Sequence, residues 1–503
     1  MKRSIRVMLL VLAVAVVGGI LLSGCGSSSS SSSSSPVVSG TTTTTYSGTL
    51  YMASGADTLG PGGHIGVFSV TIDPSNTTNP IQVDANSVNK IQLFGTPGNM
   101  TAPMIHDVRF GVNSDGTTNY NKIYYSGMMS VGTATTVVPI GYVDMTNYPI
   151  TTTHNSTIDF DNTATGPFSN GMDTIAYALS QIAPNEFGTG TRIDYCASGM
   201  NANYYFPMSM SFPAYIDAIP VANLDGRHLV KGTDFKRTYI GQIDDAMNLS
   251  LWTGVTTTIT TQDGTVLPLN ALGVPPLAFI HGASSPDGTK IYMSTNQMAG
   301  LTEANNTAGN LRAYMINASK LVSGGVTTND VLAKNISIAV ASSNSTTLGD
   351  LEGTIAYRAS FTPNGQYILQ SGSDRLIILK ASDLTEYVDS SGTGANPSGA
   401  SAAKTTAIAS GLGAGTFGGI EVHDVIATPD SRYAILSLRY YTDALHASGG
   451  IKNSGVQLYD IANKTFIGKV ATTCGLCHAS SPAADGNSRD TCGLISHLTV
   501  TTH

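Results

Sequence analysis

The sequence predicts an all-β protein whose body is a β-propeller of about seven blades, followed by a short C-terminal tail. Three observations predict this fold. A strand–turn–strand phrase recurs along the chain. Only 12% of the residues are charged, and the many glycines with a single tryptophan are typical of a turn-rich, extracytoplasmic β protein. No long amphipathic helix pattern interrupts the phrases, so the antiparallel units follow one another directly.

Each copy of the phrase begins with a short apolar strand that carries a histidine or a small residue. A turn with Asp-Gly, Asn-Gly or Pro-Asp follows, and a second strand of alternating apolar residues ends the phrase. The copies begin at Ile105-His106-Asp107-Val108, Ile280-His281-Gly282-Ala283, Arg358-Ala359-Ser360-Phe361 and Val422-His423-Asp424-Val425, with a weaker one at Tyr215-Ile216-Asp217-Ala218. Asp-Gly allows a tight hairpin, and the alternation gives each strand one buried face. Units of about four strands, repeated roughly every 50 to 70 residues, predict propeller blades.

The phrase resembles the P-H-x-x-x-x-P-D-G phrase of the YVTN-type bacterial β-propellers, as His281 followed by Pro286-Asp287-Gly288 shows best. The resemblance covers residues 46–470 and is strongest from residue 275 onward. It implies the fold and leaves the function open, because such propellers serve as enzymes, electron-transfer proteins and binding platforms. Residues 150–210 and 390–415 depart from the phrase and are interpreted as insertions or loops.

The first 25 residues have the features of an export signal. A basic segment at residues 2–6 precedes an apolar run at residues 7–22, which is not a spanning helix. Leu22-Ser23-Gly24-Cys25 resembles the bacterial lipobox, which implies that Cys25 is lipidated, and Gly26 in place of Asp implies sorting to the outer membrane. Residues 26–45, with nine consecutive serines at 27–35, predict a flexible tether. The alternative is an ordinary cleaved secretion signal.

The predicted tail, residues 471–503, contains Cys474-Gly475-Leu476-Cys477-His478. C-x-x-C-H is the attachment signature of a c-type haem: the two thiols form thioethers to the porphyrin, and the imidazole binds the iron. Export agrees with this interpretation, since covalent haem attachment takes place outside the cytoplasm. The tail is too short for a separate cytochrome domain, so we expect it to pack against the propeller. The alternative is a disulfide between Cys474 and Cys477 with an incidental histidine.

Histidines of the tail are the first candidates for the axial ligands of this haem c. His478 is the predicted proximal ligand. His497 is the first candidate for the distal ligand, because it is close in sequence and ends a phrase, Thr491–His497, that echoes the haem motif without its second thiol. His503, a propeller histidine or a methionine are the alternatives.

Cys196 and Cys492 remain once Cys25 and the haem pair are assigned. An even remainder in an oxidising compartment predicts one disulfide between them, which would join the tail to the body. Two alternatives remain open. The Cys474–Cys477 pair forms a disulfide and there is no haem, or all four thiolates bind zinc, with Cys196 far along the chain from the other three.

His106, His281 and His423 occupy the same position of three phrases. Equivalent positions of propeller blades converge on one end of the central channel, so three imidazoles there are a candidate copper or zinc site, loosely analogous to the histidine-ringed channel of nitrous oxide reductase. Such a site would make the protein a propeller enzyme. The alternative is that each histidine stabilises its own blade through hydrogen bonds.

These features together predict a lipid-anchored, extracytoplasmic c-type cytochrome of the outer membrane that transfers electrons through one haem. They resemble the cytochrome lipoproteins of metal-reducing bacteria, which implies a redox partner protein or an extracellular electron acceptor. The net charge of −8, with no basic cluster outside the signal, excludes nucleic acid as a partner. Hydrolase and nucleotide-binding motifs are absent from the sequence. The alternative function is a haem-free surface propeller that binds a protein or a glycan and has a disulfide-bonded tail.

Overall fold

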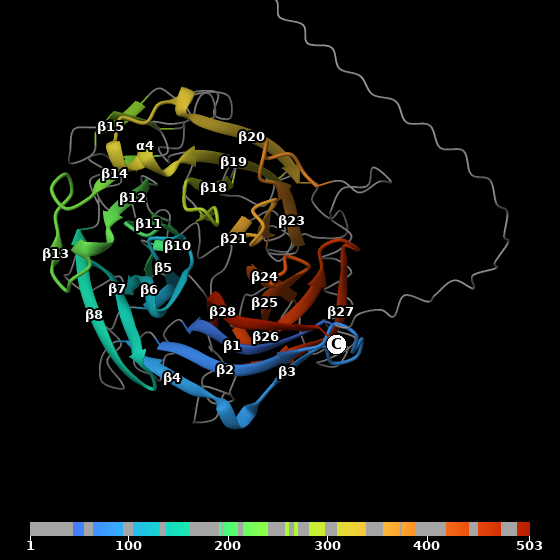
Figure 1. The fold of residues 1–503 in the computed structure, drawn as a ribbon. Helices are drawn as coiled ribbons and strands as arrows, with labels where there is room; N and C mark the ends of the chain where they lie inside the picture. The colour runs from blue at the N-terminus through green and yellow to red at the C-terminus, as the bar shows by residue number, and fades with distance from the viewer. Residues whose placement is uncertain are drawn as a thin grey trace, which may run out of the picture. The chain divides into compact units, whose positions relative to one another are not determined.

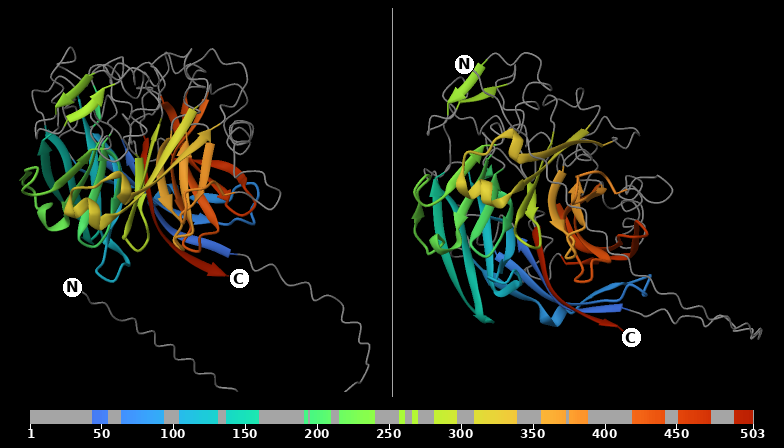
Figure 2. Two further views of the ribbon diagram at one scale, coloured as in Figure 1. Left: turned by 90° about the horizontal axis from the view of Figure 1, so that it is seen from above. Right: turned by 45° about the horizontal axis from the view of Figure 1, so that its top comes forward.

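Six sheets of three to six strands form the fold, and each is one blade of a β-propeller. The computed structural model describes residues 44–54, 64–93, 104–130, 137–159, 191–193, 195–209, 215–239, 257–260, 266–269, 281–296, 309–338, 356–372, 375–387, 419–441, 451–473 and 490–502. All of them belong to the compact unit Thr43–His503. Figures 1 and 2 show the blades of this unit following one another around a common axis.

The first three blades are built from the N-terminal half of the chain, together with the C-terminal strand β28. Blade 1 consists of β28 (Asp490–Thr502), β1 (Thr44–Ser54), β2 (His64–Ile72) and β3 (Ile81–Val83), with β4 (Asn89–Gln92) also paired with β2. Blade 2 consists of β5 (Met104–Val112), β6 (Thr118–Ser130), β7 (Val137–Asn147) and β8 (Ile150–Asp159), with the short strands β9 (Thr191–Ile193) and β13 (His228–Leu229). Blade 3 consists of β10 (Tyr195–Met200), β11 (Tyr204–Ser209), β12 (Tyr215–Pro220) and β14 (Lys236–Tyr239).

The other three blades complete the ring. Blade 4 consists of β17 (His281–Ser284), β18 (Lys290–Asn296), β19 (Gly309–Asn317) and β20 (Val331–Ile338), with helix α4 (Ala318–Ser323) after β19. Blade 5 consists of β21 (Ala356–Phe361), β22 (Tyr367–Gly372) and β23 (Arg375–Lys380). Blade 6 consists of β24 (Gly419–Ala427), β25 (Tyr433–Tyr441), β26 (Ile451–Asp460) and β27 (Thr465–Thr472). A separate hairpin, β15 (Thr257–Thr260) and β16 (Val266–Leu269), lies between blades 3 and 4 in the chain.

The ring closes through its innermost strands. β28, β5, β10, β17, β21 and β24 contact one another in that order, and β24 contacts β28 again. β28 pairs antiparallel with β1 over its whole length, so the two ends of the described chain share blade 1. In Figure 2 the red strand β28 lies beside the blue strand β1. Closure of this kind removes the sheet edge that an open ring would expose.

The number of blades is six and not the predicted seven. Residues 150–210, interpreted from the sequence as an insertion, contain β8, β10 and β11, which are blade strands. The weak phrase at residues 215–218 lies in β12, a third strand, and not in an innermost strand. The tail is also corrected, because its end is the innermost strand of blade 1 and the propeller therefore extends to Thr502.

Burial of both faces explains why most strands are more apolar than simple alternation requires. Every residue of β10 is buried, because blade 3 is covered by blades 2 and 4. Apolar clusters lie between neighbouring blades, such as Ile105, Ile123 and Tyr125 of blade 2 packed with Ile65 and Val67 of blade 1. Strands covered on both faces are expected to have near-continuous apolar runs. Within the described residues, no helix is long and apolar enough to cross a membrane.

The Asp-Gly turns have the predicted role. Gly116, Gly288 and Gly365 each have a positive φ, of +84°, +64° and +70°, in the turn that follows an innermost strand. The preceding Asp or Asn holds the turn through its side chain, as when Asp115 Oδ1 accepts the backbone N–H of Thr117 at 3.0 Å. These turns all lie at the C-terminal ends of the innermost strands.

Candidate functional site

The candidate functional site lies where the innermost strands meet. The innermost strand of every blade has a residue at the position equivalent to the predicted histidines. These residues are His106, Cys196, His281, Arg358, His423 and Cys492. The strand pairing shifts at or next to this position in every blade except blade 4, where His281 begins the strand. A β-bulge turns a side chain out of the regular pleat and is common next to functional sites. The bulge therefore turns His106, Arg358 and His423 toward the axis, where they meet.

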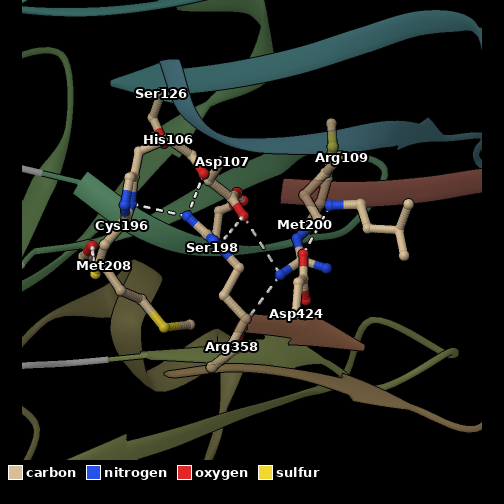
Figure 3. A network of polar contacts seen from close by, with 12 residues as sticks. His106, Asp107, Arg109, Ser126, Cys196, Ser198, Met200, Met208, Arg358 and Asp424 are labelled. Carbon is tan, nitrogen blue, oxygen red and sulfur yellow. Dashed lines mark hydrogen bonds and ion pairs between the residues drawn. The ribbon is translucent and has the colours of Figure 1, made fainter. Parts of the chain in front are cut away.

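Arg358 of blade 5 is the centre of this site (Figure 3). Its side chain is completely buried. Nη1 donates to His423 Nδ1 at 2.7 Å, and Nη2 donates to His106 Nδ1 at 2.7 Å and also to the carbonyl oxygen of His106. Because a guanidinium has only donors, both Nδ1 atoms must be acceptors, which makes both imidazoles neutral with the proton on Nε2. One cation thus joins blades 2, 5 and 6 across the axis.

Two buried carboxylates accompany the buried arginines. Asp107 Oδ1 lies 3.6 Å from Arg358 Nε and 3.5 Å from Arg109 Nη2, and its other oxygen accepts the Ser198 hydroxyl. Asp424 Oδ2 accepts the backbone N–H of Leu494 at 2.7 Å, which joins blade 6 to the closing strand β28. Two carboxylates and two guanidiniums balance in charge, as buried charges must. The network therefore joins blades 1, 2, 3, 5 and 6.

Burial dominates the titration of both carboxylates. It raises the pKa of Asp107, against the opposing effects of Arg109 and Arg358. Burial also raises the pKa of Asp424 to about 6, although Arg358 and Arg109 lower it. Asp424 is therefore a group of this network that exchanges a proton close to neutral pH.

The protonation of Asp424 predicts a pH-dependent stability. The folded protein takes up this proton near pH 6, whereas the unfolded chain takes it up only near the ordinary pKa of 3.8. The free energy of unfolding is therefore expected to rise by about 1 kcal/mol between pH 7 and pH 5 from this group alone. Asp424→Asn removes the charge and keeps an acceptor for Leu494. Urea unfolding at pH 5, 6 and 7 checks this, since the variant should lack the rise, and identical pH profiles would contradict it.

The three predicted histidines do not share one arrangement. His106 and His423 lie with ring centroids 5.7 Å apart, at 86° to each other, and Arg358 bridges them. His281 is buried at the start of β17. In the described part of the chain, no group of three or more His, Cys, Asp or Glu side chains is placed to hold a metal ion. The channel metal stays a prediction, which the neighbouring guanidinium disfavours by charge.

His497, the predicted distal haem ligand, lies on β28 opposite Thr49. It is exposed, and its ring stacks on Tyr120 with centroids 3.6 Å apart and planes at 10°. Partial burial lowers its pKa, so the neutral ring has a lone pair for a metal at pH 7. Its role at the haem stays a prediction.

The cysteine predictions fall mostly outside the described residues. Cys25, Cys474, Cys477 and His478 all lie there, as does His503. Cys196 is buried in β10, where its thiol donates to the carbonyl oxygen of Met208 at 3.7 Å. Cys492 belongs to β28 by its backbone, and its side chain is outside the description. The Cys196–Cys492 disulfide therefore stays a prediction.

Arg358 is the functional residue that the sequence reasoning missed. The signal was present, since Arg358 stands where the other phrases have His106 and His423. A buried position occupied by His in some repeats and by Arg in another indicates a shared polar site rather than independent contacts within each blade. Asp107 and Asp424, which follow two of the histidines, carry the same signal.

The known proteins that this chain is similar to are distant. No protein-family model matches the chain, and no curated protein matches it. Among solved structures, the periplasmic gluconolactonase PpgL of Pseudomonas aeruginosa is 12% identical, with 90% of this chain and 99% of that chain covered and a TM-score of 0.37. A putative TolB from Agrobacterium tumefaciens is 9% identical, with 92% and 99% covered and a TM-score of 0.32. The dihydro-haem d1 dehydrogenase NirN is 11% identical, with 89% and 75% covered and a TM-score of 0.31. The six-bladed assignment rests on the strand pairing described above.

Proposed function

We propose that this protein is an exported, lipid-anchored c-type cytochrome that transfers electrons to or from a redox partner. Cys474 and Cys477 hold one haem c by thioether bonds, His478 binds its iron, and Cys25 carries the lipid. The observation that carries the proposal is the C-x-x-C-H motif in a chain that also begins with an export signal. The donor set fits the group chemically, since two thiols at this spacing match the two porphyrin vinyl groups.

The strands on either side of the motif support attachment to the propeller body. Thr473, the residue before Cys474, is buried at the end of β27. Asp490 begins β28 after a connection of residues 474–489. Thr473 and Asp490, the described residues on either side of the motif segment, both belong to the compact unit that forms the propeller. A separate cytochrome domain is unnecessary for such a haem, because both ends of its segment are fixed to strands of the ring.

The strand pair of β1 and β28 contains the first and the last described residues of the chain. Thr44, which follows the tether, pairs with Thr502, whereas Asp490 pairs with Ser54 at the other end of β1. Eleven residues of β1 span about 33 Å. Thr44 and Asp490 therefore lie at opposite ends of the β1–β28 strand pair.

When bound, the haem supplies one-electron chemistry between Fe(II) and Fe(III). The propeller residues hold the attachment segment through β27 and β28. The Asp424–Leu494 hydrogen bond fixes β28 to the innermost strand of blade 6, close to Asp490 at the start of β28.

A redox titration tests the proposal. The protein is produced in a host with c-type maturation machinery, and its absorption is recorded after air oxidation and after dithionite reduction. We expect a Soret band with sharp, reversible visible bands in the wild type. The variant with Cys474→Ser and Cys477→Ser should lose them and keep its β-sheet circular dichroism. A colourless wild type with a Cys474–Cys477 disulfide would contradict the proposal.

A further inference from the structure

Turns that follow the innermost strands form direct hydrogen bonds with the neighbouring blade at three places. These bonds are Asn201 Nδ2 to Gly288 O at 3.2 Å between blades 3 and 4, Asn364 N to Ser431 Oγ at 3.0 Å between blades 5 and 6, and Tyr46 OH to Asp430 Oδ2 at 2.8 Å between blades 6 and 1. In the described chain, no hydrogen bond joins the turn at residues 285–288 of blade 4 to the turn at residues 362–365 of blade 5. At Gly365 an added Cβ would be in ordinary contact with Pro286, at 3.9 Å.

A pocket of about 610 Å³ opens between these two turns. This blade 4–5 pocket has mainly apolar walls, which include Pro286, Phe361, Pro363 and Tyr367. The walls are held in place from behind, because Tyr367 packs on Tyr387 with ring centroids 4.8 Å apart and Phe361 packs against the apolar cluster of blades 4 and 5. The volume lies within the range of small-molecule sites, which are typically apolar with a few polar groups.

Two lysines give the blade 4–5 pocket a positive charge. Lys290 at the start of β18 and Lys380 at the end of β23 both line it and are exposed. Neither forms an ion pair with a described residue. The carboxylate in the wall, Asp287, is engaged in its own turn, where Oδ1 accepts the Thr289 N–H at 3.1 Å and the Thr289 hydroxyl at 2.9 Å. Lys290 interacts electrostatically with Asp287 and Lys380 with Asp383, but no ion pair within the described residues holds either ammonium group, and both are exposed to a ligand.

We propose that the blade 4–5 pocket binds an aromatic carboxylate. The apolar walls take the ring, since aromatic and proline surfaces pack well on flat apolar groups. Lys290 and Lys380 take the carboxylate, whose charge-assisted hydrogen bonds are about twice as strong as neutral ones. The proposal is independent of the haem, because no residue of this pocket belongs to the channel network or to the haem segment.

The probe is 2-naphthoate, followed by its intrinsic fluorescence and by calorimetry on the full chain. A ligand of this size is expected to bind with a Kd of about 1 mM or tighter. The neutral isostere 2-naphthamide should bind at least about tenfold more weakly, since it lacks the charge. Lys290→Gln and Lys380→Gln should each weaken naphthoate binding by about fivefold or more. Lys236→Gln, an exposed lysine of blade 3, is the matched control and should leave binding unchanged.

Three results would overturn the proposal. They are equal binding of the acid and the amide, naphthoate binding that neither lysine variant weakens, and no binding by the wild type. Tighter binding of glucuronate than of naphthoate would also overturn it, in favour of a sugar-acid site. Both lysines are exposed, so the variants should unfold at the wild-type urea concentration, and this measurement separates loss of the site from loss of the fold.

Discussion

Replacing Arg358 by methionine is expected to lower the free energy of unfolding by about 3 to 5 kcal/mol. The change removes the cation that lies 3.6 Å from Asp107 and donates to His106 and His423, while both carboxylates of the network stay buried. Breaking a buried ion pair from one side leaves an uncompensated charge, and this is the costly case. Urea unfolding followed by circular dichroism measures the loss. The loss should shrink at pH 5, because burial raises the pKa of Asp424 to about 6 and protonation removes part of the unbalanced charge.

The matched control for this prediction is Arg227→Met. Arg227 pairs with Asp225 at 3.1 Å, and the two side chains are 47% and 53% exposed. Exposed pairs contribute about 1 kcal/mol or less, so this variant should unfold close to the wild type. If Arg358→Met does not fold, Arg358→Lys keeps one positive charge and provides an intermediate loss. Equal stability of the wild type and Arg358→Met would show that the network does not hold the blades together.

Replacing Gly48 by alanine is expected to cost about 3 kcal/mol of stability, near the upper end for overpacking. Gly48 lies in β1 opposite Leu498 of β28, and a Cβ there would collide with the backbone carbonyl oxygen of His497. The neighbour is backbone, so no side-chain rotation relieves the collision. The substitution must move the closing strand away from β1, and the thermal midpoint of unfolding should fall accordingly.

Gly116→Ala separates this collision from the cost of an unusual backbone angle. Gly116 has φ of +84°, and a Cβ there has no heavy atom within 4 Å. Its replacement should cost only about 1 kcal/mol, the strain of alanine at positive φ. If the two variants lose the same stability, then the contact between β1 and β28 is not what closes the ring.

The architecture could be predicted from the sequence because turns are local. Asp115-Gly116, Asp287-Gly288 and Asn364-Gly365 all form the expected turns after innermost strands. The blade count could not be predicted as well. Blade 3 begins at Tyr195 and turns at Asn201, without the Asp-Gly of the other blades. A repeat without its turn residues is hidden from a search for those residues.

The closing strand was harder to predict, because its pairing is the least local in the chain. β28 pairs with β1 across more than four hundred intervening residues, and nothing in residues 490–502 alone specifies that partner. Its echo of the haem motif at Thr491–His497 pointed to iron. The structure shows that Cys492-Gly493-Leu494 lies in the innermost strand of blade 1, and the role of His497 at a haem stays a prediction. Long-range pairing is decided by the rest of the fold and cannot be read from a segment by itself.

The site was predictable in its residue types and not in its chemistry. Equivalent phrase positions correctly placed His106 and His423 near the axis, and neutral imidazoles there suggested metal ligands. Arg358 reaches between them from blade 5, a contact that depends on the ring geometry. The local sequence pattern therefore predicts where the two histidines lie. Their hydrogen-bond partner, Arg358, comes from another blade and can be identified only from the tertiary structure.

The central claim of this account is covalent haem at Cys474 and Cys477, and a pyridine haemochrome spectrum tests it most directly. The protein is matured in a competent host, denatured and extracted with acid acetone before the spectrum is taken. We predict a c-type haemochrome band that stays with the protein after extraction and is absent from the Cys474→Ser, Cys477→Ser variant. A wild-type protein that gives no such band, or loses it entirely to the acetone, would contradict the account.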